Sequence, residues 1–443
     1  MLSRLVRHDT PSKNLDELTG PSLLLATFPN ANALLAGRKN PNGCPAKATW
    51  FAQVNYSDPI LLTQWYASGN EVADHTVTHG AADITKIENY VGSYEEVEGM
   101  RAWANAWAGI PLGKIKGFRY PYLNYTADGL KLLQKMGFEY ESSMSAMDSD
   151  AVWPYTLDHG IVNDCLGQID LCGGKVTVPG LWEIPLYGIS GPDGTHLMDP
   201  YNDGNLYTPD LPTVEQDYIS YFDKHYGGNR APFGIYTHPT WFNPPPASAI
   251  PTLPQGADGA SQKKLAMVQK VLDYAMKKPD TWMVTNAQLI EYMKAPVPAS
   301  QLASQPYMQC AQTPAPPTNI CNGIGLVGVD TCNYPTAQLQ TCYGCPESLP
   351  TLSNPVPKRN GTKKPVPADC DTIWWDSASG QCLCTADSCS YKDIGRPINL
   401  NPGSLNGQSG SSNKTAGNHE GSAKLDSMPN YFLPLFLFLV CLL

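Results

Sequence analysis

The stretch Glu71-Val72-Ala73-Asp74-His75-Thr76-Val77-Thr78-His79 says most about the fold of this chain. Residues 71–75 form a short apolar-rich run typical of a buried strand, and His79 follows His75 at a spacing of four. Residues four apart lie on one side of a helical turn, so the spacing predicts two imidazole nitrogens that converge on one metal ion. The alternative is a chance pair of exposed or hydrogen-bonded histidines, since the chain has 8 of them.

Three further segments carry polar side chains at the ends of strand-like runs. These are residues 117–122, 148–160 and 233–239. In a barrel of alternating strands and helices, the carboxyl ends of the strands form one face, and the loops of that face hold the chemistry. We therefore expect residues that are far apart in the sequence to meet there.

Strand-like and helix-like runs alternate along the chain. Apolar runs predict strands at 23–28, 48–53, 71–75, 115–119, 138–142, 233–237 and 282–285. Helical spacing predicts helices at 59–67, 83–108, 126–136 and 262–277. The alternation predicts an α/β fold with parallel strands.

Taken in order, these motifs resemble the polysaccharide deacetylases of carbohydrate esterase family 4, and among them the chitin deacetylase-like proteins. His75-Thr76-Val77-Thr78-His79 resembles the family's metal motif, and Arg119-Tyr120-Pro121-Tyr122 resembles its Arg-x-Pro-Tyr motif. Asn40-Pro41-Asn42-Gly43-Cys44-Pro45 is similar to the chitin deacetylase-like branch. The resemblance implies a distorted, incomplete (β/α) barrel, a divalent metal, most simply zinc, bound by His75 and His79, and removal of acetyl groups from N-acetylglucosamine polymers such as chitin.

The resemblance also implies a role for each of four further residues. His238 is expected to be the general acid that protonates the leaving amine, and the backbone amide of Tyr122 is expected to stabilise the oxyanion. Trp153 is expected to form a wall of the acetyl pocket. Arg119 is expected to steady a catalytic carboxylate, with a surface salt bridge as the alternative.

One departure from the family affects the site. The family carries Thr-Phe-Asp-Asp, in which the first aspartate is the base and the second binds the metal, whereas residues 23–28 here run into Pro29-Asn30. Proline has no basic side chain, and the neutral amide of Asn30 is a doubtful third metal ligand. Two hypotheses follow. Either the protein is a deacetylase, with Asp74 or Asp148 as a substitute base, or it is an inactive carbohydrate-binding or wall-structural protein.

Cysteine usage indicates a secreted, disulfide-bonded chain. Of 13 cysteines, nine lie between Cys310 and Cys389, which is too dense for a reducing cytosol. We expect Cys44 to pair with Cys310 and Cys165 with Cys172. Four glycosylation sequons agree with secretion: Asn55, Asn124, Asn360 and Asn413.

The cysteines that remain after Cys310 suggest a small module that depends on its bridges. The spacing of Cys342 and Cys345 also fits a zinc knuckle, although a disulfide is favoured in a secreted chain. Trp374, Trp375 and Tyr343 are candidates for stacking on sugar rings or, equally, for the core of this module.

Composition and the terminal segments complete the expected organisation. A net charge of -10 and a pI near 5.3 exclude nucleic acid as a natural partner. The apolar C-terminal tail follows small residues and a spacer, as in a GPI-attachment signal, with a short membrane anchor as the alternative. We expect a secreted protein held at the cell surface or wall. The expected regions are an N-terminal segment, truncated and without a signal peptide (1–21), the barrel (22–295), a linker (296–320), the cysteine-rich module (321–392), a Gly/Ser-rich linker and spacer (393–430) and the GPI-signal-like tail (431–443).

Overall fold

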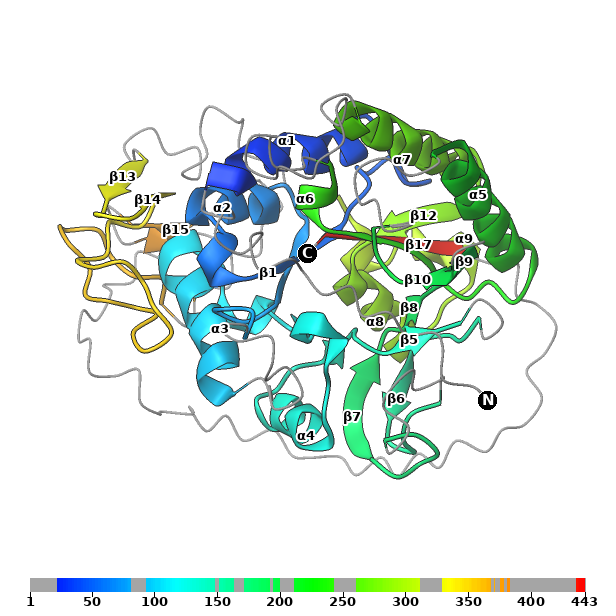
Figure 1. Cartoon of the computed structure of the whole chain (residues 1–443), viewed down its shortest axis with the longest axis horizontal. Coiled ribbons are helices and arrows are strands. Elements are labelled where there is room, and N and C mark those ends of the chain that lie inside the picture. Colours follow the sequence, from blue (N-terminus) through cyan, green and yellow to red (C-terminus); the bar gives the residue numbers. More distant parts are fainter. Residues whose placement is uncertain are drawn as a thin grey trace.

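The computed structural model describes most of the chain outside the two termini and several loops (Figure 1). The described residues are 22–80, 93–147, 151–162, 171–191, 194–199, 211–242, 260–310, 329–367, 370, 375–377, 381–382 and 436–442.

One large sheet organises the molecule. Its 9 strands follow the order β11-β17-β1-β2-β3-β4-β7-β6, and β12 also pairs with β17. All neighbours pair in parallel except β6 and β7. The predicted fold class, an α/β fold in the form of a distorted, incomplete barrel with a disulfide-bonded C-terminal part, is confirmed. The strands are β1 (Thr49–Ala52), β2 (Glu71–Asp74), β3 (Gly117–Phe118), β4 (Tyr140–Glu141), β6 (Tyr155–Leu157), β7 (Val178–Glu183), β11 (Phe233–Thr237), β12 (Thr281–Val284) and β17 (Phe436–Leu442).

Smaller two-stranded pairs flank the large sheet. They are β5 (Ser145–Ala146) with β8 (Leu186–Tyr187), β9 (Ile189–Gly191) with β10 (Gly194–His196), β13 (Asp330–Asn333) with β14 (Gln338–Thr341), and β15 (Trp375–Asp376) with β16 (Gln381–Cys382).

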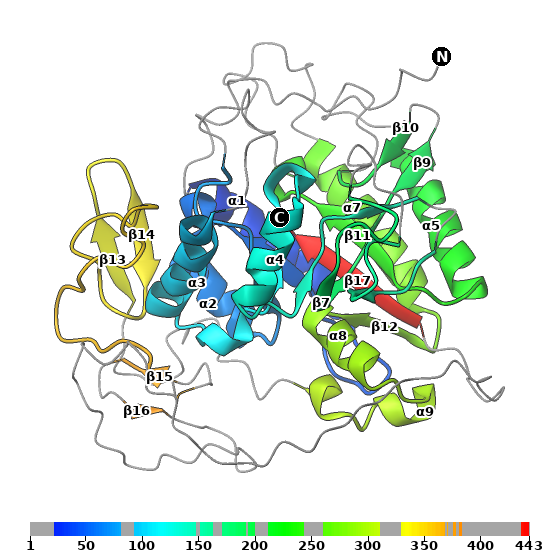
Figure 2. The same cartoon turned by 90° about the horizontal axis from the view of Figure 1, so that it is seen from below.

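Helices cover the sheet (Figures 1 and 2). Helix α5 packs against α7, and α2 packs against α3. Four helices begin where a side chain caps the first turn, namely Asp58 before α2, Ser93 before α3, Thr126 before α4 and Thr285 before α8. The helices are α1 (Ser22–Leu35), α2 (Pro59–Ala67), α3 (Tyr94–Ala108), α4 (Ala127–Lys135), α5 (Leu211–Gly227), α6 (Pro239–Phe242), α7 (Ala260–Met276), α8 (Asn286–Lys294) and α9 (Ala299–Leu302).

The first apolar segment differs from its prediction. Residues 23–28, predicted as a strand, lie within helix α1. Phe28, Ala31 and Leu34 are all buried, and burial at every third residue is a helical pattern. The Phe28 ring stacks at 6.0 Å from the ring of Trp50 on β1. The apolar run therefore packs against the sheet as a helix and does not pair within it.

The C-terminal apolar segment occupies a place inside the sheet. Strand β17 pairs in parallel with β11 and β12, and at its carboxyl end with β1, where Leu442 lies opposite Trp50. Figure 1 shows this strand in red at the centre of the sheet. A strand covered on both faces reads as a continuous apolar run, which is the character of residues 436–442. The structure thus uses as an interior strand a segment that was predicted to be a removable tail.

Disulfides tie the C-terminal part to the barrel. Cys44 pairs with Cys310 as predicted, with a Cα–Cα distance of 4.9 Å. This bond and the packing of Leu302 and Met308 into the apolar core attach the first half of the predicted linker to the barrel. Cys172 is disulfide-bonded, but its expected partner Cys165 lies outside the described residues.

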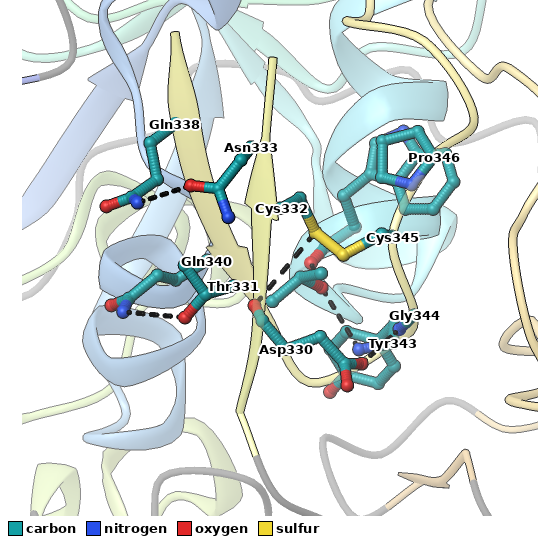
Figure 3. Close-up of a disulfide and its surroundings, with 12 residues drawn as sticks. Asp330, Thr331, Cys332, Asn333, Gln338, Gln340, Tyr343, Gly344, Cys345 and Pro346 are labelled. Carbon is teal, nitrogen blue, oxygen red and sulfur yellow. Dashed lines mark hydrogen bonds between the residues drawn. A yellow bond between two sulfur atoms is a disulfide. The ribbon is translucent and has the colours of Figure 1, made fainter.

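Within the cysteine-rich module, a second described bridge joins Cys332 to Cys345 beside the β13–β14 hairpin (Figure 3). Cys342 is also disulfide-bonded. Cys342 and Cys345 are thus both in disulfides, but not with each other. The prediction that these cysteines form disulfides is confirmed, and the zinc-knuckle alternative is wrong because neither sulfur is a free thiolate.

This module packs on α2 and α3. The Thr341 hydroxyl donates to the Trp107 carbonyl (2.6 Å), and the Arg359 guanidinium donates to the Ala106 carbonyl (3.0 Å). The ring of Tyr343 is buried against Gly109, and Trp375 is 1% exposed, with its indole Nε1 donating to the Lys364 carbonyl (3.0 Å).

Buried rings cannot stack on a sugar. The sugar-binding hypothesis is therefore wrong for Trp375 and Tyr343, and the alternative of a core role is confirmed for both, because so small a module needs its aromatic side chains for packing. Trp374 lies outside the described residues.

Candidate active site

The two histidines predicted to bind a metal lie close together, but not on a helix. Residues after β2 form a loop in which Thr76 and His79 have positive φ angles of 75° and 65°. The centroids of the His75 and His79 rings are 4.8 Å apart. The predicted pairing of the two side chains is thus present. The predicted helical turn is wrong, because a loop with two left-handed residues brings the rings together instead.

Both imidazoles lie in surroundings that keep them neutral. Burial, and next the charge of His79, holds the pKa of His75 well below its ordinary value, and burial with the charge of His238 lowers the pKa of His79 to about 3. The Nδ1 of His75 donates to the Arg119 carbonyl (2.9 Å), which leaves Nε2 as the acceptor. A neutral imidazole whose second nitrogen is fixed in this way is a typical metal ligand.

His238 forms a pair with an aspartate that no sequence motif indicated. The Nδ1 of His238 donates to Asp199 at 2.5 Å, and the other carboxylate oxygen accepts from the His238 amide and the Thr237 hydroxyl at 2.8 Å each. Burial lowers the pKa of His238, but the charge of Asp199 and its hydrogen bond outweigh burial and raise it. The side chain is still 43% exposed, so this imidazole ring can reach a bound molecule.

Arg119 is buried, so the surface salt bridge considered for it is wrong. Its Nε donates to the Ser142 carbonyl (2.5 Å) and its Nη2 to the Ser142 hydroxyl (2.8 Å). The guanidinium lies over the Phe51 ring at 4.0 Å. Among the described residues Nη1 meets no hydrogen-bond partner, although the charge of Arg119 acts on the buried carboxyl groups of Glu141 and Glu183.

Tyr122 lies beside His79, and Trp153 packs against an apolar cluster. Tyr122 belongs to the 3-10 turn η4 (Pro121–Leu123), and its ring is 4.6 Å from the His79 ring. Trp153 donates from Nε1 to the Asn229 carbonyl (3.1 Å). Trp153 and Leu123 pack against the same apolar cluster, which includes the Phe51 ring. The oxyanion and pocket roles of Tyr122 and Trp153 stay predictions.

Three strand ends bring the titratable groups of the site together. His75 follows β2, Arg119 follows β3 and His238 follows β11. The charges of Arg119 and His238 both act on the pKa of His75, so these side chains share one region despite their distance in sequence. The expectation that polar residues at strand ends meet is confirmed for these three.

A third metal ligand is not found among the described residues, where no group of three His, Cys, Asp or Glu side chains could hold an ion. Asn30, the doubtful ligand, lies on α1 and not at a strand end, because residues 22–35 form a helix. Asp74 interacts with charged groups on α3, namely Arg101, Glu98 and Glu96. Asp148 lies outside the described residues. A catalytic zinc site has three protein ligands, so the described residues fit only two positions of such a site.

Comparisons with known proteins found a matching family and several relatives. The polysaccharide deacetylase family model matches residues 43–141, which include His75, His79 and Arg119. A relative from Bombyx mori, chitin deacetylase 8, is 30% identical over 338 residues, covering 73% of this chain and 80% of its own length. Chitin deacetylase 1 from Bombyx mori is 25% identical, with 72% and 58% covered. A crystal structure from Mycobacterium smegmatis, assigned to the polysaccharide deacetylases, aligns with a TM-score of 0.37 and 17% identity over 63% of this chain and 78% of its own.

The chain belongs to the polysaccharide deacetylase family. Polysaccharides are the substrates of this family, and its chitin deacetylases generally depend on a metal. Within the part of the chain that is described, no helix is both long and apolar enough to cross a bilayer. The disulfides fit an oxidising, extracellular environment.

Proposed function

We propose that this protein is a chitin deacetylase-like hydrolase that removes acetyl groups from N-acetylglucosamine polymers at the cell surface. One observation carries the proposal, namely that the neutral His75–His79 pair, Arg119 and the His238–Asp199 pair converge at the strand ends of one sheet. The two relatives are both chitin deacetylases, which supports chitin as the substrate.

His238 is the proposed proton donor to the leaving nitrogen. Asp199 holds Nδ1, so the proton on Nε2 is the one free to transfer, and the raised pKa keeps the ring protonated at higher pH than an isolated histidine. The backbone amide of Tyr122 is proposed to stabilise the oxyanion, and Trp153 is proposed to line the acetyl pocket.

Zinc is our proposal for the metal, because neutral imidazole is a ligand that zinc favours. His75 and His79 would hold it, but two histidines are an incomplete ligand set. Zinc affinity, measured by titration calorimetry on the folded chain, tests this part separately from turnover.

The function is tested by acetate release from N-acetylglucosamine oligomers, with zinc or cobalt added, for the wild type, His238→Ala and His159→Ala. His159 is an exposed histidine and serves as the matched control. We expect His238→Ala to lower the rate by roughly 100 to 10,000-fold, the usual contribution of general acid catalysis, and His159→Ala to leave it unchanged. Binding of the oligomers by the wild type with no acetate release would contradict the proposal and favour an inactive carbohydrate-binding protein.

A further inference from the structure

The loop that carries His75 and His79 adopts a conformation that it would not hold alone. Thr76 and His79 are not glycines, yet both have left-handed φ angles, and a β-branched residue such as threonine is a rare exception in that region. Such backbone conformations are unfavourable by themselves, so the surrounding structure must fix the loop.

The middle of this loop is bound by one carboxylate on α3. Glu96 accepts from the backbone amides of Val77 and Thr78 at 2.9 Å each through Oε2, and from the Thr78 hydroxyl through Oε1. Glu96 is 5% exposed and lies in the first turn of α3, after the capping residue Ser93. The amino-terminal end of a helix favours a negative charge, so α3 is a suitable support for this carboxylate.

The two ends of the loop depend on different contacts. At the start, Asp74 accepts from the Thr76 amide (2.8 Å), and at the end the Thr76 hydroxyl accepts from the His79 amide (3.1 Å). Between them the buried Val77 side chain packs at Gly99 of α3, where a Cβ atom would lie 2.8 Å from Val77 Cγ2. The amides of Val54 and Asn55 donate to the carbonyls of Thr76 and Val77. The bonds to Glu96 fix the same segment from its other side, so the position of His79 relative to His75 depends on them.

We propose that Glu96 is a positioning residue for the His75–His79 pair. All three groups that Glu96 binds are hydrogen-bond donors in these contacts, which suits a carboxylate that only accepts. In Glu96→Gln the side-chain amide would keep one acceptor oxygen. Its NH2 group would face a donor that the carboxylate now accepts from. The link to catalysis rests on the proposed function, but the placement of the two rings does not.

The experiment compares Glu96→Gln with Glu98→Gln, a same-sized change on the same helix whose carboxylate forms a partly exposed ion pair with Arg101 at 3.7 Å. In metal-free, histidine-labelled protein, the nuclear Overhauser effect between the His75 and His79 rings reports their placement directly. We expect Glu96→Gln to lose this signal and to bind zinc roughly 10 to 100-fold more weakly, as when a group that orients a ligand is removed. Glu98→Gln should change neither. A retained ring-to-ring signal in folded Glu96→Gln would overturn the proposal.

A second variant covers the case in which Glu96→Gln does not fold. Thr78→Val keeps the size of the side chain and removes only the hydroxyl donor to Glu96. We expect a weakened ring-to-ring signal in a folded protein, and an unchanged signal would count against the positioning role. If the wild type releases no acetate while these signals behave as expected, the proposed function fails and the positioning role stands.

Discussion

Two apolar segments of this chain fold differently from what their sequence patterns predict. They are residues 22–35 and residues 436–442. The first resembles the opening strand of the family and forms helix α1, whereas the second resembles a removable tail and forms strand β17. Pro29 has no amide hydrogen and so could not complete a ladder in the middle of a sheet. The run Phe436–Leu442 is uniformly apolar and free of proline and glycine, which suits a strand with both faces covered.

The comparison shows that a segment can complete the sheet without completing the active site. The carboxyl end of β17 lies opposite Thr237 and Trp50, next to the strand ends that carry the histidines. By resemblance to the family, the first strand of the chain would be followed by two aspartates. Residues 436–442 contain no carboxylate side chain, so β17 fills the sheet without supplying a base or a third metal ligand.

The largest expected effect comes from removing β17. Deletion of residues 436–443 should unfold the protein or lower the free energy of unfolding by about 5 kcal/mol or more, because β1, β11 and β12 all lose backbone partners that contribute about 1 kcal/mol each. The measurement is thermal or urea unfolding, with deletion of the Gly/Ser-rich residues 403–423 as the control, for which we expect little change.

Expression in a secretory host gives a second test of whether β17 belongs to the folded protein. If β17 is part of the folded protein, mass spectrometry of the mature chain should find residues 436–442 retained. Their absence, together with release of the protein from membranes by phosphatidylinositol-specific phospholipase, would instead support the GPI-signal prediction for residues 431–443 and refute the strand.

A second effect tests α1. Phe28→Ala should lower the free energy of unfolding by about 3–5 kcal/mol, since a buried ring that stacks on Trp50 and contacts Trp65 leaves a cavity. The matched control is Leu35→Ala, because Leu35 is only partly buried on the same helix, and its loss should be clearly smaller. Equal losses in chemical unfolding experiments would argue against the helical packing.

A third prediction tests whether the cysteine-rich module folds together with the barrel. Burial raises the pKa of Asp58 to about 6, although its acceptor bonds from Ile60 and from Gln340 of the module lower it. The folded state therefore binds a proton more readily than the unfolded state. The free energy of unfolding should fall as pH rises from about 4 to about 6, by about 3 kcal/mol, relative to Asp58→Asn, which keeps an acceptor oxygen and does not titrate. Parallel pH curves for the two proteins would contradict a buried Asp58.

The smallest expected effect comes from restoring the family's aspartates at Pro29 and Asn30. In a helix these positions do not follow a strand, so Pro29→Asp with Asn30→Asp should leave zinc affinity and acetate release within about twofold of the wild type. The natural comparison is His75→Ala in the same assays, which should weaken zinc binding. A large gain from the two aspartates would mean that residues 22–35 enter the sheet after all.

The sequence by itself determined many of the helices and strands and identified the main residues of the candidate active site. The predicted strands at 48–53, 71–75, 115–119, 138–142, 233–237 and 282–285 follow from hydrophobic periodicity, which depends only on near neighbours in the chain, whereas β6, β7 and α5 were not predicted. The residue types in the motifs identified His75, His79, Arg119 and His238, and the structure brings these four together. The strand-end rule for parallel sheets explains why this part was predictable.

Only the tertiary structure decided which groups these residues meet. Asp199 lies 39 positions before His238, and Glu96 lies 18 positions after Thr78, so neither partner stands at a spacing that a motif records. The helix at residues 22–35 and the strand at residues 436–442 are also not decided locally, because strand pairing depends on segments that are far apart in the sequence. Burial settled the role of Trp375 for the same reason, since a side chain is inside or outside only once its distant neighbours are in place.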